Sequence, residues 1–258
     1  MVLGSASADI ECPASTRLLL IRHAQTVGTR HYLMAGRTDV PLSPLGRRQA
    51  RELASAVEPY PIVAIYQSPL GRARETAAAL MKRRGEIPLR TCNDLRELDL
   101  GVADGLDALE AYRRWPRCLS RALDATTNDF AFFGGEWWSE GEARAEKAIA
   151  AIVGAHPAET VGVVTHGAVL GLLLTRWLDQ PRGSWRLHQP APGSLSIAIA
   201  WPAEGGPTVQ LEAFSATAFW SRAVRAAVRL PTRLPHRSLT PPRRPVRYTL
   251  EQSVCETK

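Results

Sequence analysis

The 258-residue sequence has few cysteines, few aromatic residues and no apolar run of membrane-spanning length. Its four cysteines stand far apart without a Cys-x-x-Cys pair, which argues against a disulfide framework and favours free thiols in a reducing compartment. The longest apolar stretch in the C-terminal half, residues 168–174, is far too short to span a membrane. The N-terminus lacks the basic and apolar regions of a signal peptide. These absences predict a cytoplasmic protein with no membrane span.

Positive charge is concentrated at the C-terminal end of the chain. The formal net charge is +7, and residues 222–258 carry nine basic side chains against two acidic ones. This tail is rich in arginine and proline, a composition that buries no core, so we expect it to be disordered. No aromatic residues are interleaved between its arginines for base stacking. The tail therefore predicts non-specific binding of polyanions and no specific recognition of nucleic acid.

Strand and helix patterns alternate along residues 16–221, after a small, polar segment (residues 1–15) that we expect to be a disordered leader. Continuous apolar runs predict strands at 17–21, 62–66, 161–165, 195–201 and 208–214, with a weaker strand at 87–91. Helix starts are predicted by the Ser-Pro pairs at 43–44 and 68–69 and by a capping box at 139–142, and residues 167–178 form an apolar helix. The alternation predicts an α/β fold, a three-layer α/β/α sandwich around a mostly parallel central sheet.

Residues 102–138 interrupt this alternation and predict a short helical and aromatic insertion. If residues 112–123 form one helix, Arg113, Arg117 and Arg121 share one stripe, which is either a solvated face, as we favour, or a grip for an acidic substrate. Five aromatic residues follow: Phe130, Phe132, Phe133, Trp137 and Trp138. They form either the small core of the insertion, as we favour, or a lid that seats an apolar leaving group.

Charged side chains follow the predicted strands at the carboxyl ends, where ligands bind in open α/β sheets. In chain order these residues are Arg22, His23, Ser68, Arg72, Glu97, Thr165, His166 and Gly167. Guanidinium groups match phosphate oxygens, and helix starts at Ser68 and Gly167 would add amide N–H donors. Two histidines, two arginines and one carboxylate thus predict an anion pocket suited to phosphoryl transfer.

Six motifs in one order carry a resemblance to a known family. They are Arg22-His-Ala-Gln-Thr26, the block from Gly36 to Ala50, Ser68-Pro-Leu-Gly-Arg-Ala-Arg-Glu-Thr76, the block from Glu97 to Gly105, Gly134-Gly-Glu136 and Thr165-His-Gly167. From about residue 17 to residue 214, the chain resembles the histidine phosphatase superfamily in its phosphoglycerate-mutase-like branch. Residues 16–221 are therefore expected to form the catalytic domain, with the insertion at 102–138 over its active site.

The resemblance implies a role for each residue of the pocket. His23 would be the nucleophile that forms a phosphohistidine; Arg22, Arg72 and His166 would hold the phosphoryl group, and Glu97 would protonate the leaving oxygen. Thr26, Ser68 and Gly167 are expected to bind substrate. The resemblance implies neither a metal nor a cofactor. The sequence departs from the family pattern in three places, namely at Ala24 instead of glycine, at Thr29 instead of asparagine, and at Trp137-Trp138, where a small hydroxyl residue is usual.

The short insertion favours hydrolysis, because mutases of this family carry a longer and more basic cap that excludes water. We therefore expect a phosphomonoesterase that acts on a small phosphorylated metabolite. The alternatives are a phosphoglycerate-mutase-type phosphoryl transfer and a non-catalytic module that binds a phosphorylated ligand. The identity of the substrate and the oligomeric state stay open.

Overall fold

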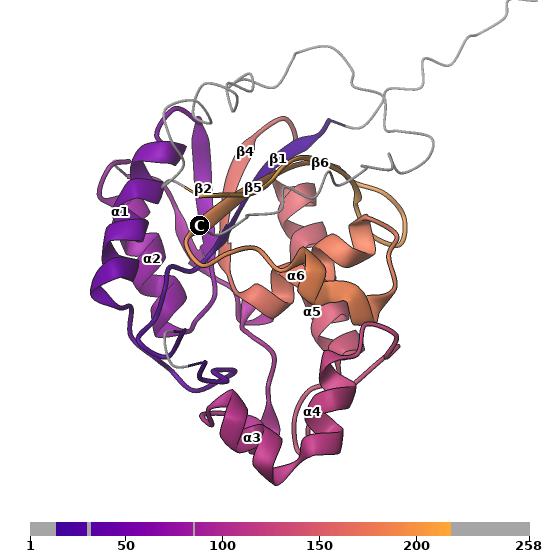
Figure 1. Ribbon diagram of the computed structural model, residues 1–258. Coiled ribbons are helices and arrows are strands. Elements are labelled where there is room, and N and C mark those ends of the chain that lie inside the picture. Colours follow the sequence, from indigo (N-terminus) through magenta and orange to yellow (C-terminus); the bar gives the residue numbers. More distant parts are fainter. Residues whose placement is uncertain (1–13, 30–31, 85, 218–258) are drawn as a thin grey trace, which may run out of the picture.

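The computed structural model describes residues 14–29, 32–84 and 86–217 (Figure 1). The predictions of a disordered leader and of a disordered basic tail concern residues that lie almost wholly outside these ranges. Within them, six strands form one sheet in the order β3-β2-β4-β1-β5-β6. Pairs β3–β2, β2–β4 and β4–β1 are parallel, whereas β1–β5 and β5–β6 are antiparallel. The mostly parallel α/β sheet predicted from the sequence is confirmed.

The predicted strands all occur, with bounds that differ by a few residues. The strands are β1 (Thr16–Arg22), β2 (Ile62–Gln67), β3 (Leu89–Thr91), β4 (Thr160–Thr165), β5 (Ser194–Trp201) and β6 (Thr208–Thr217). The α-helices are α1 (Pro44–Val57), α2 (Gly71–Met81), α3 (Ala108–Arg114), α4 (Pro116–Leu123), α5 (Trp138–Ala155) and α6 (Gly167–Trp177). The short 3₁₀ helices are η2 (Asn93–Leu95), η3 (Gly101–Ala103) and η4 (Arg182–His188).

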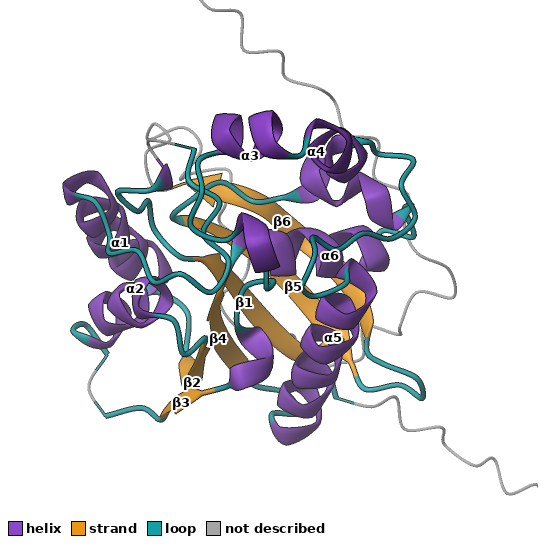
Figure 2. Cartoon of the chain, turned by 90° about the horizontal axis from the view of Figure 1, so that it is seen from below, coloured by secondary structure: helices purple, strands orange, loops and turns teal. Residues whose placement is uncertain are grey.

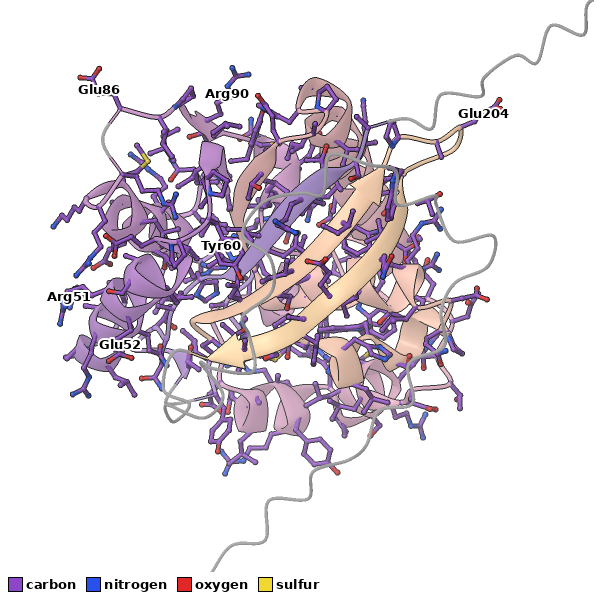
Figure 3. The ribbon with its side chains drawn as sticks, turned by 90° about the horizontal axis from the view of Figure 1, so that it is seen from above. Arg51, Glu52, Tyr60, Glu86, Arg90 and Glu204 are labelled. Atoms are coloured by element: carbon purple, nitrogen blue, oxygen red, sulfur yellow. The ribbon has the colours of Figure 1, made fainter. Side chains whose placement is uncertain are left out.

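Helices cover both faces of the sheet, α1 and α2 on one face and α5 and α6 on the other (Figure 2). Strand β1 lies inside the sheet, and its side chains alternate between the two layers. Leu18 and Leu20 pack with α5 and α6, while Leu19 and Ile21 pack with α1 and α2. On the outer side of α1, Arg51 and Glu52 point away from the sheet (Figure 3). The buried strands thus read as continuous apolar runs because both faces are covered.

Two predicted helix starts are wrong by a few residues. Helix α2 begins at Gly71 rather than at Pro69, and the Ser68 hydroxyl accepts the Leu70 N–H within a turn that precedes the helix. Helix α5 begins at Trp138, ahead of the predicted capping box. There the Glu140 carboxylate accepts the Trp137 N–H, while the Ser139 hydroxyl donates to Asp129 instead of capping the helix. Both serine hydroxyls also have a partner distant in sequence, His166 for Ser68 and Asp129 for Ser139, which local sequence does not show.

The basic piece of the insertion is two helices, because Pro116 has no N–H to continue the first one and disfavours helical torsions at Trp115. The expected stripe of Arg113, Arg117 and Arg121 along one helix is therefore wrong. Both α3 and α4 lie beyond one end of the sheet (Figure 1). No helix of the described residues is long and apolar enough to cross a membrane.

Most of the predicted aromatic cluster is the core of the insertion. Phe130, Phe132 and Trp138 are buried and pack with Trp185 of η4 and with Leu172 of α6. The prediction is wrong for Phe133 and Trp137, whose exposed fractions are 86% and 47%. The insertion is thus anchored on the helix that begins directly after His166.

Candidate active site

The carboxyl ends of β1 and β4 bring the two predicted histidines together. The strands are parallel neighbours in which Arg22 is paired with Thr165, and the next residue of each is a histidine. The main-chain N–H of His23 donates to the Thr165 carbonyl at 2.9 Å, which continues the hydrogen-bond ladder between the strands by one residue. As a result, the ring centroids of His23 and His166 lie 5.1 Å apart.

One hydrogen bond determines which nitrogen of His23 is free. Its Nδ1 lies 2.8 Å from the carbonyl oxygen of Ala24. A carbonyl oxygen only accepts, so Nδ1 carries the proton and donates it to this bond. In a neutral ring the other nitrogen, Nε2, then holds an unshared electron pair. His23 is therefore held in the tautomer that a nucleophilic Nε2 requires.

The surroundings keep both imidazoles neutral. Burial, together with the guanidinium groups of Arg72 and Arg22, holds the pKa of His23 well below its ordinary value of 6.5. Burial and the same two cations also lower the pKa of His166. Because a neutral imidazole attacks phosphorus without prior deprotonation, the low pKa of His23 favours nucleophilic chemistry at neutral pH.

Ser68 forms a hydrogen bond with the ring of His166. Its hydroxyl oxygen lies 2.6 Å from His166 Nε2, and it already accepts the Leu70 N–H. When the Ser68 hydroxyl donates its proton to Nε2, the proton of a neutral His166 lies on Nδ1. This Nδ1 is buried and has no hydrogen-bond partner among the residues described. The predicted contact of Ser68 with substrate stays a prediction, while its contact with His166 is direct.

Arg22 is held by one carbonyl and by a close approach to α6. Its Nη1 donates to the Pro190 carbonyl at 2.6 Å, while its buried Nε lacks a partner within the described part of the chain. Burial lowers the pKa of Arg22 to about 10, against the opposing effect of the Glu97 carboxylate, so the guanidinium is charged at neutral pH. A Cβ at Gly167 would lie 2.7 Å from Arg22 Cζ. Glycine is thus needed there because the guanidinium packs against the start of α6.

The guanidinium of Arg72 is bound by the loop of residues 35–38. It donates to the carbonyls of Thr38, Ala35 and Gly36 at 2.9, 3.1 and 2.7 Å. These three bonds leave two of its five N–H donors for a ligand. The same loop is held from the insertion side by Asp104, whose carboxylate accepts the N–H groups of residues 36, 37 and 38. Burial lowers the pKa of Arg72.

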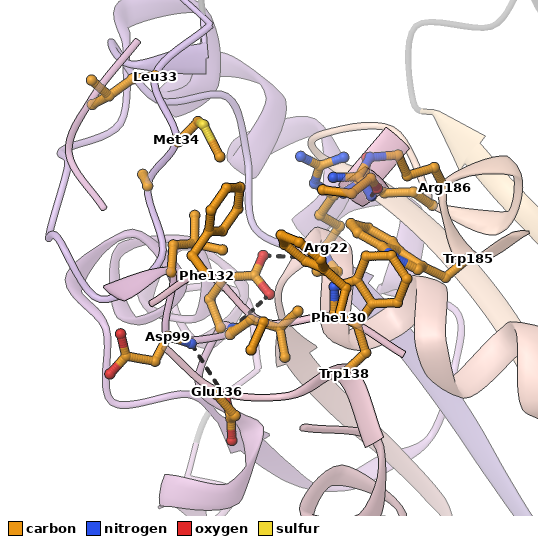
Figure 4. Close-up of a pocket in the computed structure, with 18 residues that line it drawn as sticks. Arg22, Leu33, Met34, Asp99, Phe130, Phe132, Glu136, Trp138, Trp185 and Arg186 are labelled. Atoms are coloured by element: carbon orange, nitrogen blue, oxygen red, sulfur yellow. Dashed lines mark hydrogen bonds between the residues drawn. The ribbon is translucent and has the colours of Figure 1, made fainter. Parts of the chain in front are cut away.

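Glu97 sits at the N-terminus of α6, although it belongs to the segment after β3. Its carboxylate accepts the N–H groups of Leu98, Ala168 and Val169 at 3.1, 3.2 and 3.3 Å. Its backbone is fixed as well, because Arg144 donates to the Glu97 carbonyl at 3.1 Å. The carboxylate and Arg22 both line a cavity of about 210 Å³ that extends under the insertion (Figure 4).

Strand-end histidines, arginines and a carboxylate in one site can be compared with those of known protein families. The sequence profile of the histidine phosphatase superfamily (branch 1) matches residues 18–213, which include every site residue named above. The chain belongs to this superfamily.

Relatives of this histidine phosphatase carry both phosphatase and mutase names. The uncharacterized phosphatase PhoE of Bacillus subtilis is 31% identical over 160 residues, which cover 62% of this chain and 76% of PhoE. Phosphoglycerate mutase-like protein 4 of Arabidopsis thaliana is 32% identical over 169 residues, covering 65% and 74% of the two chains. A mycobacterial glucosyl-3-phosphoglycerate phosphatase solved in complex with VO3 has a TM-score of 0.70 and 28% identity, covering 78% of this chain and 99% of that one.

Two of the family motifs have a supporting function that the sequence did not reveal. Glu136 of the Gly-Gly-Glu motif accepts from Arg144 at 2.6 and 2.8 Å, and this arginine in turn holds the Glu97 backbone. The hydroxyl of Thr26 accepts the Thr29 N–H at 3.1 Å and lies 2.9 Å from the Thr29 hydroxyl. Thr26 thus stabilises the turn after His23, and its predicted contact with substrate stays a prediction.

The lowered pKa values predict that neither site histidine titrates near its ordinary value. We expect the ¹³Cε1 shifts of His23 and His166 to stay constant from pH 8 down to about pH 6, because both rings remain neutral over that range. A pH titration by NMR, with each resonance assigned through its glutamine variant, checks this. A midpoint near 6.5 for His23 would contradict the electrostatic account of its nucleophilicity.

Proposed function

We propose that this histidine phosphatase hydrolyses a small phosphate monoester through a phosphohistidine formed on Nε2 of His23. The observation that carries the proposal is the bond from His23 Nδ1 to the Ala24 carbonyl, which leaves Nε2 with its electron pair in a ring whose pKa is well below 6.5. Around it, Arg22 Nε and His166 Nδ1 are buried without partners among the described residues. Phosphoryl oxygens would supply the acceptors that such buried groups lack.

In the first step His23 Nε2 attacks phosphorus, and the bond between phosphorus and the leaving oxygen breaks. Arg22, Arg72 and His166 stabilise the charge on the equatorial oxygens of the transferring group. Glu97 gives its proton to the leaving oxygen, so the leaving group departs as an alcohol. A phosphoryl dianion beside a carboxylate favours a shared proton, because like charges in close contact disfavour full ionisation.

In the second step water attacks the phosphorus of the phosphohistidine. The P–N bond breaks and its electron pair returns to His23 Nε2, while the Glu97 carboxylate accepts a proton from the attacking water. Inorganic phosphate then leaves, and both residues are restored. The same carboxyl group thus acts as acid in one half-reaction and as base in the other.

The two guanidinium groups would supply the positive charge that a metal ion supplies in other phosphoryl-transfer enzymes. Arg22 keeps its charge at neutral pH with a pKa of about 10, and Arg72 lies beside it. We therefore include metal independence in the proposal. It predicts unchanged turnover in the presence of a chelator.

Phosphate release with a panel of phosphorylated metabolites and aryl phosphates, measured with and without EDTA, tests the function. We expect inorganic phosphate as the product and the same rate with EDTA. Movement of phosphate between hydroxyl groups without release would favour the mutase alternative. Phosphate esters that bind without either reaction would favour the binding-module alternative.

A further inference from the structure

The cavity beside the reacting groups is large enough for part of a substrate. The cavity has a volume of about 210 Å³, and its lining includes Arg22, Glu97, residues 33–35 and residues of the insertion and of η4. A cavity of about 150 Å³ holds a benzene molecule, so this one accommodates a ring with one or two substituents. Because Glu97 is the proposed donor to the leaving oxygen, the cavity lies where the leaving group would be.

Aromatic side chains form one wall of this cavity. Phe130, Phe132, Trp138 and Trp185 line it, and all four are buried (Figure 4). Each ring packs against another with centroids 4.9 to 5.9 Å apart, in tilted or edge-on contacts. Such mutual packing fixes the rings in place, so the wall is a preformed apolar surface that suits a planar group.

Arg186 provides a positive charge at this cavity, and among the described residues no carboxylate pairs with it. Its guanidinium lies over the Trp185 ring, 4.2 Å from the centroid, and Nη1 donates to the Ala122 carbonyl at 2.8 Å. No acidic side chain of the described residues forms an ion pair with it. Burial lowers the pKa of Arg186 to about 10, so the group stays charged at neutral pH.

The carboxylates that share the cavity are already engaged. Glu136 pairs with Arg144, and Asp99 lies 4.0 Å from Arg37. Glu97 faces Arg22 and accepts three backbone N–H groups. Arg186 is therefore a cavity cation that lacks a negative partner among the described residues, and a half-buried cation of this kind is stabilised by an anionic ligand group.

We propose that the cavity binds the leaving group of the substrate, and that this group joins a planar apolar body to a carboxylate that pairs with Arg186. The inference rests on the proposed phosphatase activity and names its substrate class. A single guanidinium, with one nitrogen already bound to Ala122, matches a singly charged carboxylate better than a second phosphate dianion. The ring would pack on Phe132 and Trp138 while its ester oxygen lies at Glu97.

Two aryl phosphates that differ only in charge test the carboxylate. 4-(Carboxymethyl)phenyl phosphate and 4-(carbamoylmethyl)phenyl phosphate have almost the same shape, and the methylene group separates the substituent from the ring electronically. We expect kcat/KM to be about 10- to 100-fold higher for the carboxylate, the usual range for a charge-assisted hydrogen bond. In Arg186→Gln the ratio should fall to within about twofold of unity. In the control Arg117→Gln, which changes an exposed arginine of the insertion, the ratio should be unchanged.

Product inhibition tests the apolar wall separately. 4-Hydroxyphenylacetate, the alcohol released from the charged ester, should inhibit at a concentration at least about tenfold lower than acetate, because its ring buries apolar surface that acetate lacks. Equal inhibition by the two would contradict the aromatic site. Phe132→Ala should weaken inhibition by 4-hydroxyphenylacetate and leave inhibition by acetate unchanged.

The outcomes separate this inference from the function on which it rests. A wild-type ratio near unity, with both esters hydrolysed, overturns the carboxylate site and leaves the phosphatase activity intact. Hydrolysis of alkyl phosphates but of neither aryl ester also overturns the proposed leaving-group site and leaves the phosphatase activity intact. Absence of phosphate release from every ester refutes the proposed function itself. If Arg186→Gln does not fold, Arg186→Lys replaces it as the test variant. Because lysine keeps the positive charge, this variant should still prefer the carboxylate ester to the amide ester. Loss of that preference in folded Arg186→Lys would contradict the pairing of Arg186 with the substrate carboxylate.

Discussion

Phosphate release should fall by about 10⁴-fold or more when His23 is replaced by alanine, because the variant has no nucleophile in the place of Nε2. The fold should persist, since the ring makes one side-chain hydrogen bond and the backbone bond to Thr165 remains. Rapid quenching of the wild type with ³²P-labelled substrate should trap a protein-bound phosphate that is labile in acid and stable in base. The alanine variant should trap none.

A histidine outside the site provides the control. His156 is buried at the end of α5, and its ring bonds to Tyr66 and to Glu159. Its carbonyl accepts the hydroxyl of Thr16, at the start of β1, so it lies at the opposite end of that strand from His23. His156→Ala should therefore lower the melting temperature and keep the trapped phosphate. Trapping that survives in His23→Ala would contradict the phosphohistidine on His23.

The second large effect is a leaving-group dependence created by Glu97→Gln. General acid catalysis contributes about 10²- to 10⁴-fold, and the contribution is greatest when the leaving alkoxide is basic. An alkyl phosphate should therefore lose a factor in this range. A nitrophenyl phosphate, whose leaving group departs without much protonation, should lose far less. Steady-state kcat/KM for both esters in wild type and variant gives the ratio.

The contacts of Glu97 explain why the losses of kcat/KM for the two esters must be compared with each other, because the loss for one ester alone does not identify the acid. Both carboxylate oxygens accept backbone N–H groups, Oε1 from Leu98 and Val169 and Oε2 from Ala168. In the glutamine variant an amide NH2 group replaces one oxygen and meets an N–H donor, which disturbs the start of α6. Such a disturbance slows both esters equally, whereas loss of the proton slows the alkyl ester more.

His166 is the rival acid, and its variant completes the comparison. Burial holds the pKa of His166 well below 6.5, so its ring is neutral and a poor acid at neutral pH. As a ligand of the phosphoryl group it should affect both esters alike when changed to glutamine. Equal losses in Glu97→Gln combined with a leaving-group dependence in His166→Gln would reverse the two assignments.

The central part of the fold could be predicted because burial leaves a direct trace in the sequence. Leu18 to Ile21 read as one apolar run because helices cover both faces of β1. The same argument placed His23 and His166 at one end of the sheet, since residues after parallel strands meet at the carboxyl ends. These predictions needed only local patterns and one topological rule.

The parts that could not be predicted depend on contacts between distant segments. Ser68 resembles a helix cap in local sequence, yet its hydroxyl bonds to a residue 98 positions away. Arg186 lies in the 3₁₀ segment η4 with no periodic signal, and its importance comes from the cavity formed with the insertion. The break at Trp115 was visible in principle, because Pro116 stood inside the predicted helix.

Asp104 and Glu136, near the two ends of the insertion, bond to segments that hold the catalytic groups, whereas the residues between them line the cavity. Asp104 fixes the loop that binds Arg72, and Glu136 acts through Arg144 on the backbone of Glu97. Residues 105–135 lie between these two and supply Ala122, Phe130 and Phe132 to the cavity. We expect the part of this stretch beyond Ala108 to tolerate changes of length or shape, because residues 105–108 bond to the backbone of residues 32–34 and Asp104 and Glu136 keep their own bonds. That part is the natural place to graft segments from relatives when a new substrate preference is sought.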